Sequence, residues 1–340
     1  MLDVSLTTAL VVFLVAALVI AVAGTFLARL ADRLADRTGL GEAVAGAVLL
    51  GASTSTPGTV TSVVAGYSGN VDLAASNALG GIAAQTAFLA IADITYRRAN
   101  LEHAAASASN LTQAALLILL LVIPLIAIHT PDATVFAIHP ATVVLFVAYV
   151  AGVRMARRDR DDPMWSPKQT PKTRPDTPED EANPRPTWLL FVVFGMLVAV
   201  IGVAGYLVAR TGILIARETG IGETVVGTLM TAVATSLPEL VTTVAAVRAG
   251  ALQLAVGGII GGNLFDVLFL SAADVAYRDG SIYHAIGADS AFWALVGLAM
   301  TGVLLLGLIR RQEHGPANIG FESVLMLVIY AGAVALTVAM

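Results

Sequence analysis

The sequence contains no cysteine and few charged residues. The absence of cysteine excludes a disulfide framework, a thiolate metal site and a thiol nucleophile. Asp, Glu, Lys and Arg make up 13% of the 340 residues, whereas 57% are hydrophobic and the mean hydropathy is +0.83. Soluble domains contain about 25% charged residues, and a soluble fold of this size cannot bury so much apolar surface. The composition therefore excludes a cytosolic enzyme and a nucleic-acid-binding protein.

The apolar residues are gathered in ten runs that are long enough to cross a membrane. A hydrocarbon core about 30 Å thick requires about 20 residues of helix. The runs cover residues 6–28, 42–67, 71–96, 111–129, 134–155, 188–209, 222–248, 252–275, 287–309 and 320–340. The first run follows no basic residue and is too long for a signal peptide, so we expect it to be a true span. The sequence thus predicts an all-α polytopic membrane protein with ten transmembrane helices.

A stretch rich in proline and charge, residues 156–187, separates the spans into two groups of five. Proline lacks the backbone donor that a helix needs and the charges prevent burial, so we expect a flexible linker. With the N-terminus outside, 16 of the 19 Lys and Arg residues lie in inner loops, as the positive-inside rule requires. We therefore expect a cytoplasmic linker and two external termini, and we interpret the membrane as a prokaryotic plasma membrane.

An internal repeat relates residues 41–97 to residues 222–278. A shift of 181 residues aligns the two segments without a gap and gives 22 identities in 57 positions, including shared GE, TS-x-P, GG and AD-x-x-YR motifs. Each half has an odd number of spans, so the second copy must enter the membrane from the opposite side. Inverted repeats are typical of secondary transporters, whose substrate site lies where the repeats meet. We predict two inverted five-helix repeats, in residues 1–155 and 188–340; a duplicated scaffold is the alternative.

Two polar motifs lie near the middle of spans in the second repeat, TSLPE at 235–239 and GGNLFD at 261–266. Pro238 removes a helix hydrogen bond, so the first of these helices should kink or open. Carbonyl groups freed in a bilayer need a partner, which can be a side chain, water or a cation. The adjacent glycines weaken the second helix and allow another backbone to come close.

Glu239 and Asp266 are the only acids in the middle third of any span. An ionisable group there costs about 3 kcal/mol, so function is the default interpretation; the alternative is a protonated acid bonded to a neighbouring helix. Thr235, Ser236 and Asn263 add hydroxyl and amide oxygens nearby. An oxygen-only set suits a hard cation, Na⁺ or Ca²⁺, rather than zinc or copper.

The equivalent positions of the first repeat carry neutral groups. Thr54 and Ser55 are retained, but Gly58 stands in place of the glutamate. Gln85 stands in place of the aspartate, and Ile82 in place of the asparagine. The first repeat is therefore expected to supply hydroxyl, carbonyl and amide oxygens without charge.

Several further polar residues are open to a structural interpretation. Ser76 and Asn77 add polar atoms one turn before the GG pair of the first repeat, where close helix packing is the alternative. Glu42 and Glu223 lie at helix starts, where the helix dipole favours acids.

Acids and histidines at the span ends also have a structural interpretation. We interpret Asp93 and Asp274, which lie at span ends, as interfacial anchors. The five histidines lie in loops or at span edges, without metal-ligand spacing, and we expect them to be solvated; they are His103, His129, His139, His284 and His314.

The two motifs resemble the signatures of the cation/calcium antiporter superfamily, which includes the sodium/calcium exchangers. Its repeats carry G-T-S-x-P-E in one helix and G-S-N-x-x-N/D in the next; the second repeat here reads A-T-S-L-P-E and G-G-N-L-F-D. SGNVDLAASNALGG in the first repeat is similar to the family's G-N-x-D-x-A-x-x-N segment. The resemblance implies a 5+5 helix fold with alternating access. It also implies Glu239 and Asp266 as principal cation ligands, although the family usually has a second glutamate at the position of Gly58.

The remaining ligands implied by the resemblance are neutral. They are Thr235, Ser236, Asn263, Thr54, Ser55, Asn77 and Gln85. The expected function is a secondary-active antiporter, not an enzyme, that exchanges Ca²⁺ against Na⁺ or H⁺ and needs no cofactor besides the transported ions. The alternatives are an exchanger of monovalent cations, protons or another divalent ion on the same fold, and a non-transporting membrane scaffold or sensor. The expected partners are the lipid bilayer and inorganic cations, not nucleic acid.

Overall fold

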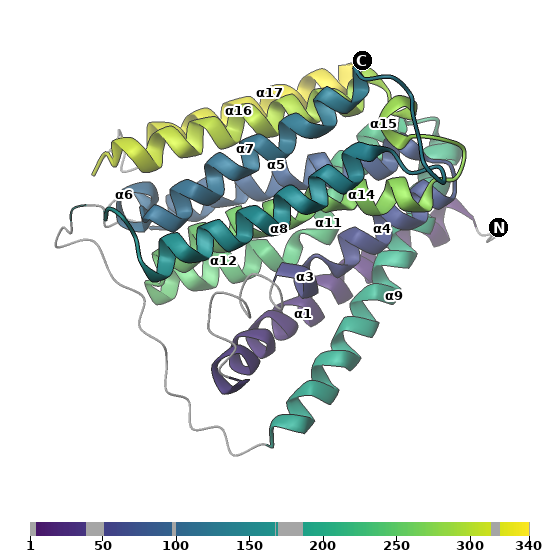
Figure 1. Ribbon diagram of the computed structural model, residues 1–340. Helices are drawn as coiled ribbons and strands as arrows, with labels where there is room; N and C mark the ends of the chain where they lie inside the picture. The colour runs from purple at the N-terminus through teal and green to yellow at the C-terminus, as the bar shows by residue number, and fades with distance from the viewer. Residues whose placement is uncertain are drawn as a thin grey trace.

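The computed structural model describes residues 5–38, 51–96, 100–166, 168, 186–313 and 320–339. Among these residues the chain is a bundle of helices, and the one strand-like pairing is an isolated bridge between Val135 and Ile138 (Figure 1). Eight of the described helices are long and apolar enough to cross a membrane, or nine if a bent pair counts as one span. The first part of the expected span 42–67, including Glu42, lies outside the described residues. The predicted all-α polytopic fold class is confirmed.

The first half of the chain contributes seven described helices. They are α1 (Leu6–Thr38), α3 (Gly51–Thr54), α4 (Thr56–Tyr67), α5 (Val71–Thr95), α6 (Leu101–Ala105), α7 (Ala108–Ile128) and α8 (Pro140–Asp161). The second half repeats this order. Its helices are α9 (Thr187–Thr219), α10 (Glu223–Val225), the π-helical segment η2 (Val226–Thr231), α11 (Ala232–Thr235), α12 (Leu237–Ala249), α13 (Leu252–Asp266), α14 (Leu268–Ala276), α15 (Ile282–Ala285), α16 (Ala288–Arg310) and α17 (Phe321–Ala339).

The helix boundaries extend the internal repeat over nearly the whole chain. The first helix of each half has 33 residues, starting at residues 6 and 187. α5 starts at residue 71 and α13 at residue 252, while α8 and α17 start at residues 140 and 321. All three pairs keep the offset of 181 residues that the sequence predicts for 41–97 and 222–278 alone. The repeat is therefore a property of the five-helix half.

Both halves contain a helix that is broken at the serine of the TS-x-P motif. α3 ends before Ser55 and α11 ends before Ser236, and the proline that follows lies in the first turn of the next helix. Proline suits that position because its missing N–H would have no partner there. The axis bends by 48° at the second break. The predicted opening of the TSLPE helix is confirmed.

The expected span 252–275 is interrupted after its paired glycines. Gly261 and Gly262 remain helical, and α13 ends at Asp266, immediately before Val267. The glycines instead create space, because a Cβ on Gly262 would lie 3.2 Å from Gln85 Oε1. Gly262 therefore lets α13 approach α5 of the other repeat.

α1 and α9 pack across the proline breaks of the opposite repeat. A Cβ on Gly24 of α1 would lie 2.4 Å from Pro238 Cγ, and one on Gly205 of α9 would lie 2.5 Å from the Pro57 carbonyl oxygen. Glycine is required where backbones or rings come this close. The two contacts are equivalent under the repeat, so the halves are joined reciprocally.

Some helix ends differ from the predicted span edges. α1 continues to Thr38, and α9 to Thr219, ten residues past the expected edges at 28 and 209. α8 continues to Asp161, and therefore includes the first six residues of the stretch 156–187 that is expected to be the linker. Polar residues end the hydrophobic run in these places, but they do not stop a helix that leaves the bilayer core.

Asp93 and Asp274 are buried, which corrects the expectation of interfacial anchors. Both are 0% exposed. The Asp93 carboxylate accepts hydrogen bonds from the N–H groups of Leu101 (2.8 Å) and Gly320 (3.2 Å), next to the first turns of α6 and α17. Helix N-termini carry unpaired N–H groups and a partial positive charge, so a buried aspartate satisfies both.

The histidines also depart from expectation, because His103 and His139 are buried. The His103 ring Nδ1 lies 2.7 Å from the Arg311 carbonyl oxygen. His284 Nε2 makes the equivalent contact of 2.7 Å with the carbonyl oxygen of Thr130. His129 is exposed, as expected, and His314 lies outside the described residues.

Candidate cation-binding site

Four polar side chains from the two repeats meet between the broken helices. Ser55 Oγ donates to Asp266 Oδ1 at 2.7 Å. Gln85 Nε2 donates to Asp266 Oδ2 at 2.5 Å and to Ser236 Oγ at 3.1 Å. All four side chains are buried. We call these four residues the junction cluster.

The junction cluster has the symmetry of the repeat. Ser55 and Ser236 are the serines at the two helix breaks, and Gln85 and Asp266 are also separated by 181 residues. Ser55 contacts Asp266 and Ser236 contacts Gln85, so each serine contacts the acid or amide of the opposite repeat. The predicted meeting of the repeats at these motifs is thus visible in side-chain contacts, and the single charge of the cluster comes from the second repeat.

Glu239 brings the second carboxylate, from the first turn of α12. Its side chain is buried and is hydrogen-bonded to Thr54 across the repeat boundary. The partial positive charge at a helix N-terminus stabilises a carboxylate in this position. Glu239 therefore couples the break of one repeat to the break of the other, as the Ser55–Asp266 contact does.

Three oxygens around the junction cluster accept no hydrogen bond within the described part of the chain. They are Gln85 Oε1, Glu239 Oε2 and Asn263 Oδ1, all on buried side chains. The Asn263 amide is oriented by its nitrogen, which donates to Thr86 Oγ1 at 3.0 Å. Buried acceptors without donors are rare in folded proteins. Acceptor oxygens left over in this way fit a hard cation.

Asn77 and Thr235 have their polar atoms directed to other partners. The Asn77 nitrogen donates to the Gly58 carbonyl oxygen (3.1 Å) and to Ser62 Oγ (3.0 Å), while its oxygen accepts from Thr231 Oγ1 (2.8 Å). Thr235 Oγ1 donates to the carbonyl oxygen of Ala232 in its own helix. Asn77 thus ties α4 to the segment before the break of the second repeat.

The position of Gly58 is filled by an aromatic ring. A Cβ on Gly58 would lie 2.5 Å from Phe269 Cε2 and 2.9 Å from its Cζ. Phe269 is buried in α14 and contacts Phe265 edge to face, with 6.2 Å between the ring centroids. Glutamate is absent here, and the space that its side chain would enter is occupied by hydrocarbon.

No basic residue accompanies the two carboxylates in the core helices. The stretches 51–96, 223–247 and 252–277 contain no Lys or Arg. In the described ranges, no group of three or more His, Cys, Asp or Glu side chains is placed to hold a metal ion. A cation at the junction would therefore meet two carboxylates and several neutral oxygens.

Sequence reasoning missed four residues that shape this region: Ser62, Thr86, Thr231 and Phe269. Thr86 directly follows Gln85, so its place beside the site could have been inferred from the motif. Thr231 lies one turn before the TS-x-P motif, at the end of the π-helical segment, a feature that often marks functional sites. For Phe269 the sequence carries no signal, because its contact with Gly58 joins distant segments.

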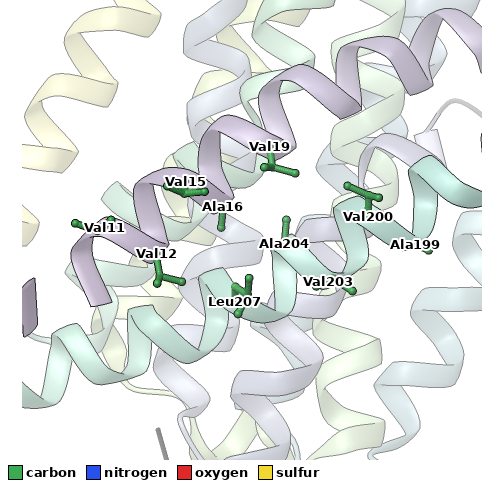
Figure 2. Close-up of a pocket in the computed structure, with 10 residues that line it drawn as sticks. All are labelled: Val11, Val12, Val15, Ala16, Val19, Ala199, Val200, Val203, Ala204 and Leu207. Atoms are coloured by element: carbon green, nitrogen blue, oxygen red, sulfur yellow. The ribbon is translucent and has the colours of Figure 1, made fainter. Parts of the chain in front are cut away.

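A groove between α1 and α9 offers no alternative cation site. It has a volume of about 590 Å³ and is lined by aliphatic side chains of the two helices (Figure 2). The residues drawn are Val11, Val12, Val15, Ala16, Val19, Ala199, Val200, Val203, Ala204 and Leu207. Such a surface provides no oxygen ligands and suits contact with lipid.

Comparison with known families agrees with the geometry. The family model described as sodium/calcium exchanger protein matches residues 8–156 and 189–339. The chain belongs to the sodium/calcium exchanger family. The two matched blocks correspond to the two five-helix halves, so the resemblance inferred from the motifs is confirmed. A member of this family is an integral membrane transporter of the antiporter type, surrounded by lipid.

Curated relatives in the family share moderate identity with the chain. The putative antiporter CaxA of Alkalimonas amylolytica is 26% identical over 298 residues, which cover 83% of this chain and 85% of the relative. Inner membrane protein YrbG of Escherichia coli is 30% identical over 139 residues, or 41% of this chain and 39% of the relative. Sodium/calcium exchanger MaX1 of Methanosarcina acetivorans is 43% identical over 79 residues, or 23% and 22%.

Solved structures of the sodium-calcium exchanger NCX_Mj have the same fold. One, soaked with 100 mM Na⁺ and 10 mM Sr²⁺, aligns with a TM-score of 0.63 at 20% identity. Another, soaked with 2.5 mM Na⁺ and 10 mM Sr²⁺, aligns with a TM-score of 0.64 at 19% identity. Both alignments cover 97% of this chain and 99% of the other. At this identity the likeness establishes the fold.

Proposed function

We propose that this exchanger family member is a secondary-active antiporter that exchanges Ca²⁺ for Na⁺ or H⁺ by alternating access. The observation that carries the proposal is the junction cluster with Glu239, where two buried carboxylates lie at the broken helices and the surrounding stretches 51–96, 223–247 and 252–277 hold no Lys or Arg. Burying two carboxylates without a counter-charge raises the free energy of the protein, and a bound cation offsets this increase. The competing ions would occupy the same oxygens, one set at a time.

The proposed principal ligands are Glu239 and Asp266. Gln85 and Asn263 add amide oxygens that accept no hydrogen bond from any described residue, and Ser55 donates to one carboxylate. The remaining proposed ligands are Thr54, Ser236 and Thr235. Asn77, whose amide is engaged by Thr231 and Gly58, acts in this proposal as a positioning residue that holds the helix breaks together.

Alternating access requires that a ligand favour one conformation over another. In the empty protein, the two carboxylates of the second repeat repel each other and would be desolvated against the first repeat, which disfavours closure. One Ca²⁺ or two monovalent cations neutralise both charges and allow the halves to close. Only loaded forms would then change the side from which the site is reached, which couples the two ion fluxes. The inner side would be that of the linker 156–187, with both termini outside.

A second candidate is an exchanger of monovalent cations, protons or another divalent ion on the same site. The contact between Gly58 and Phe269 favours it, because the ring excludes a third carboxylate from the space beside the cluster. Fewer negative charges lower the affinity for divalent ions relative to monovalent ones. Flux of each ion measured in turn separates the two candidates: sodium or proton flux that ignores Ca²⁺ supports the second.

Reconstituted vesicles test the proposal. We expect imposed Na⁺ or pH gradients to drive ⁴⁵Ca²⁺ uptake by the wild-type protein, and Glu239→Gln to abolish it. Glu218→Gln, an exposed acid near the end of α9, is the matched control and should keep wild-type uptake. Wild-type rates in Glu239→Gln vesicles, with the protein amount verified, would refute the assigned site.

A further inference from the structure

The two ends of the bundle are closed by equivalent corners. The Asp93 corner consists of Asp93, Asn100, Glu102, Gly320, Glu322 and Ser323. The Asp274 corner consists of the residues related to them by the repeat, which are Asp274, Ser281, Tyr283, His139, Ala141 and Thr142. Figure 1 shows the short helices of the two corners, α6 and α15, at opposite ends of the bundle. Both corners lie away from the helix breaks.

The backbone of the two corners is held in the same way. Asp274 accepts from the N–H groups of Ile282 (3.0 Å) and His139 (2.9 Å), just as Asp93 accepts from Leu101 and Gly320. Thr142 Oγ1 also donates to Asp274, at 2.7 Å. The shared contacts show what the fold needs at each end: one buried aspartate that caps two helices.

The side chains beside the aspartates differ between the corners. Tyr283 fills the Asp274 corner, fully buried, with its hydroxyl 3.0 Å from Thr142 Oγ1. In the Asp93 corner the positions of Tyr283 and Ala141 carry Glu102 and Glu322, which are 2% and 1% exposed. Since the Asp274 corner is closed without additional acids, the fold alone does not account for a buried pair of glutamates in the Asp93 corner.

The two glutamates lie side by side in a niche made by two glycines. A Cβ on Gly307 of α16 would lie 2.5 Å from Glu322 Cγ and 3.1 Å from Glu102 Cγ. A Cβ on Gly320 would lie 2.9 Å from Glu322 Oε2, 3.2 Å from Glu102 Oε2 and 3.6 Å from Asn100 Cγ. Three polar side chains therefore converge on the same small space.

Four oxygens in that space have no hydrogen-bond partner within the described ranges: Glu102 Oε2, both Glu322 carboxylate oxygens and Asn100 Oδ1. The Asn100 side chain is 1% exposed, and its nitrogen is fixed by the Gln312 carbonyl oxygen at 2.9 Å. The amide oxygen is thereby left for another partner. Asp93 differs, because both of its oxygens accept hydrogen bonds from helix N-termini.

The acids of the Asp93 corner lie close enough to repel one another when they are charged. Glu102 is buried beside the carboxyl groups of Asp93 and Glu322, so burial and then the neighbouring like charges disfavour its charged form. Arg310 is the basic group that faces Glu322, and its guanidinium also lies 5.0 Å from the centre of the Phe321 ring. Among the described residues one arginine faces three carboxyl groups, so ionising all three would leave an excess of negative charge.

We propose that Glu102, Glu322 and Asn100 form a second cation site, which binds one hard divalent ion such as Ca²⁺ and is separate from the junction cluster. Carboxylate and amide oxygens are the ligands that Ca²⁺ prefers. The ion would neutralise the pair and tie α6 to α17. If the linker is cytoplasmic, this site lies on the cytoplasmic side, where it would report the ion concentration of that compartment.

Calorimetry on the purified full-length protein tests the proposal. In the Glu239→Gln/Asp266→Asn background, which disables the junction cluster, we expect Ca²⁺ to bind at one remaining site. Adding Glu102→Tyr and Glu322→Ala copies the Asp274 corner and should weaken this binding about 100-fold or more, because both charged ligands are lost. Adding Glu102→Gln and Glu322→Gln, which keep the side-chain shape, should have the same effect.

Three outcomes decide the matter once thermal unfolding has verified that each variant is folded. Residual binding that both pairs of substitutions remove supports the site. Absence of Ca²⁺ binding in the Glu239→Gln/Asp266→Asn background overturns it and leaves a shared proton as the occupant of the corner. Binding that survives in the folded corner variants also overturns it. The proposed antiport is tested separately by ⁴⁵Ca²⁺ uptake, because every protein in this calorimetric series already lacks the Glu239 and Asp266 carboxylates.

Discussion

At the residue scale, the charge of the site depends on pairs of equivalent residues that differ between the repeats. Gln85 faces Asp266, and Gly58 is the counterpart of Glu239. The two repeats thus have the same helix arrangement around the site, and the second repeat alone carries the acids. Hydrogen bonds that are equivalent by symmetry are consequently unequal in energy.

The two serines at the breaks provide a direct comparison. Ser55 donates to a carboxylate, whereas Ser236 accepts from a neutral amide. Loss of a hydrogen bond to a charged group costs about 1.5–3 kcal/mol, and loss of a neutral one about 0.5–1.5 kcal/mol. We expect Ser55→Ala to raise the KM for Ca²⁺ more than Ser236→Ala does, in ⁴⁵Ca²⁺ uptake by vesicles. Equal effects of the two variants would contradict the assigned contacts.

Phe269 controls whether a third acid fits. Gly58→Glu alone should lower the free energy of unfolding by about 1–3 kcal/mol, because its Cβ would overlap the Phe269 ring. The double variant Gly58→Glu/Phe269→Ala should lose less stability relative to Phe269→Ala than Gly58→Glu loses relative to the wild type. Thermal unfolding in detergent measures both, with Phe269→Ala as the control. A Gly58→Glu protein as stable as the wild type would show that the Phe269 ring can move aside, and would contradict its proposed role in excluding a third acid.

At the scale of the elements, features that depend on residues within one helical turn can be predicted from the sequence, whereas contacts between distant segments cannot. Pro238 specified the break of its helix because the missing N–H acts within one turn. The end of α9 at Thr219 was missed because a helix can continue past its apolar run. Asp93 was misplaced at the interface because one of its partners, Gly320, is 227 residues away. Position on a span can be read from the sequence, but the partner of a buried polar group cannot.

The reciprocal glycine contacts give a prediction for helix packing. Gly205→Ala should lower the thermal stability, by about 1–3 kcal/mol in the free energy of unfolding, because the added Cβ would collide with the backbone at Pro57. Gly195→Ala on the same helix, where no atom of another residue lies within 4 Å of the added Cβ, is the matched control. It should be neutral or stabilising, since alanine favours helix. Similar unfolding temperatures for both variants would exclude the tight crossing of α9 and α4.

At the scale of the whole molecule, the helices that carry the site contain no Lys or Arg in the stretches 51–96, 223–247 and 252–277. The charge of the two carboxylates is therefore balanced by the bound ions. Two carboxylates are neutralised by one Ca²⁺ or by two monovalent cations, so both loaded forms carry the same net charge. We expect Ca²⁺ exchange in vesicles to be independent of an imposed membrane potential. A potential set with K⁺ and valinomycin provides the measurement, and a several-fold change of rate with its sign would mean that the counter-ions do not match in charge.

The most direct test of the central claim is a crystal structure of the protein soaked with Sr²⁺, examined by anomalous scattering. The account predicts a peak bounded by the carboxylates of Glu239 and Asp266 and by the amide oxygens of Gln85 and Asn263. A structure in which Sr²⁺ avoids this junction, or in which the two carboxylates face lipid, would contradict it.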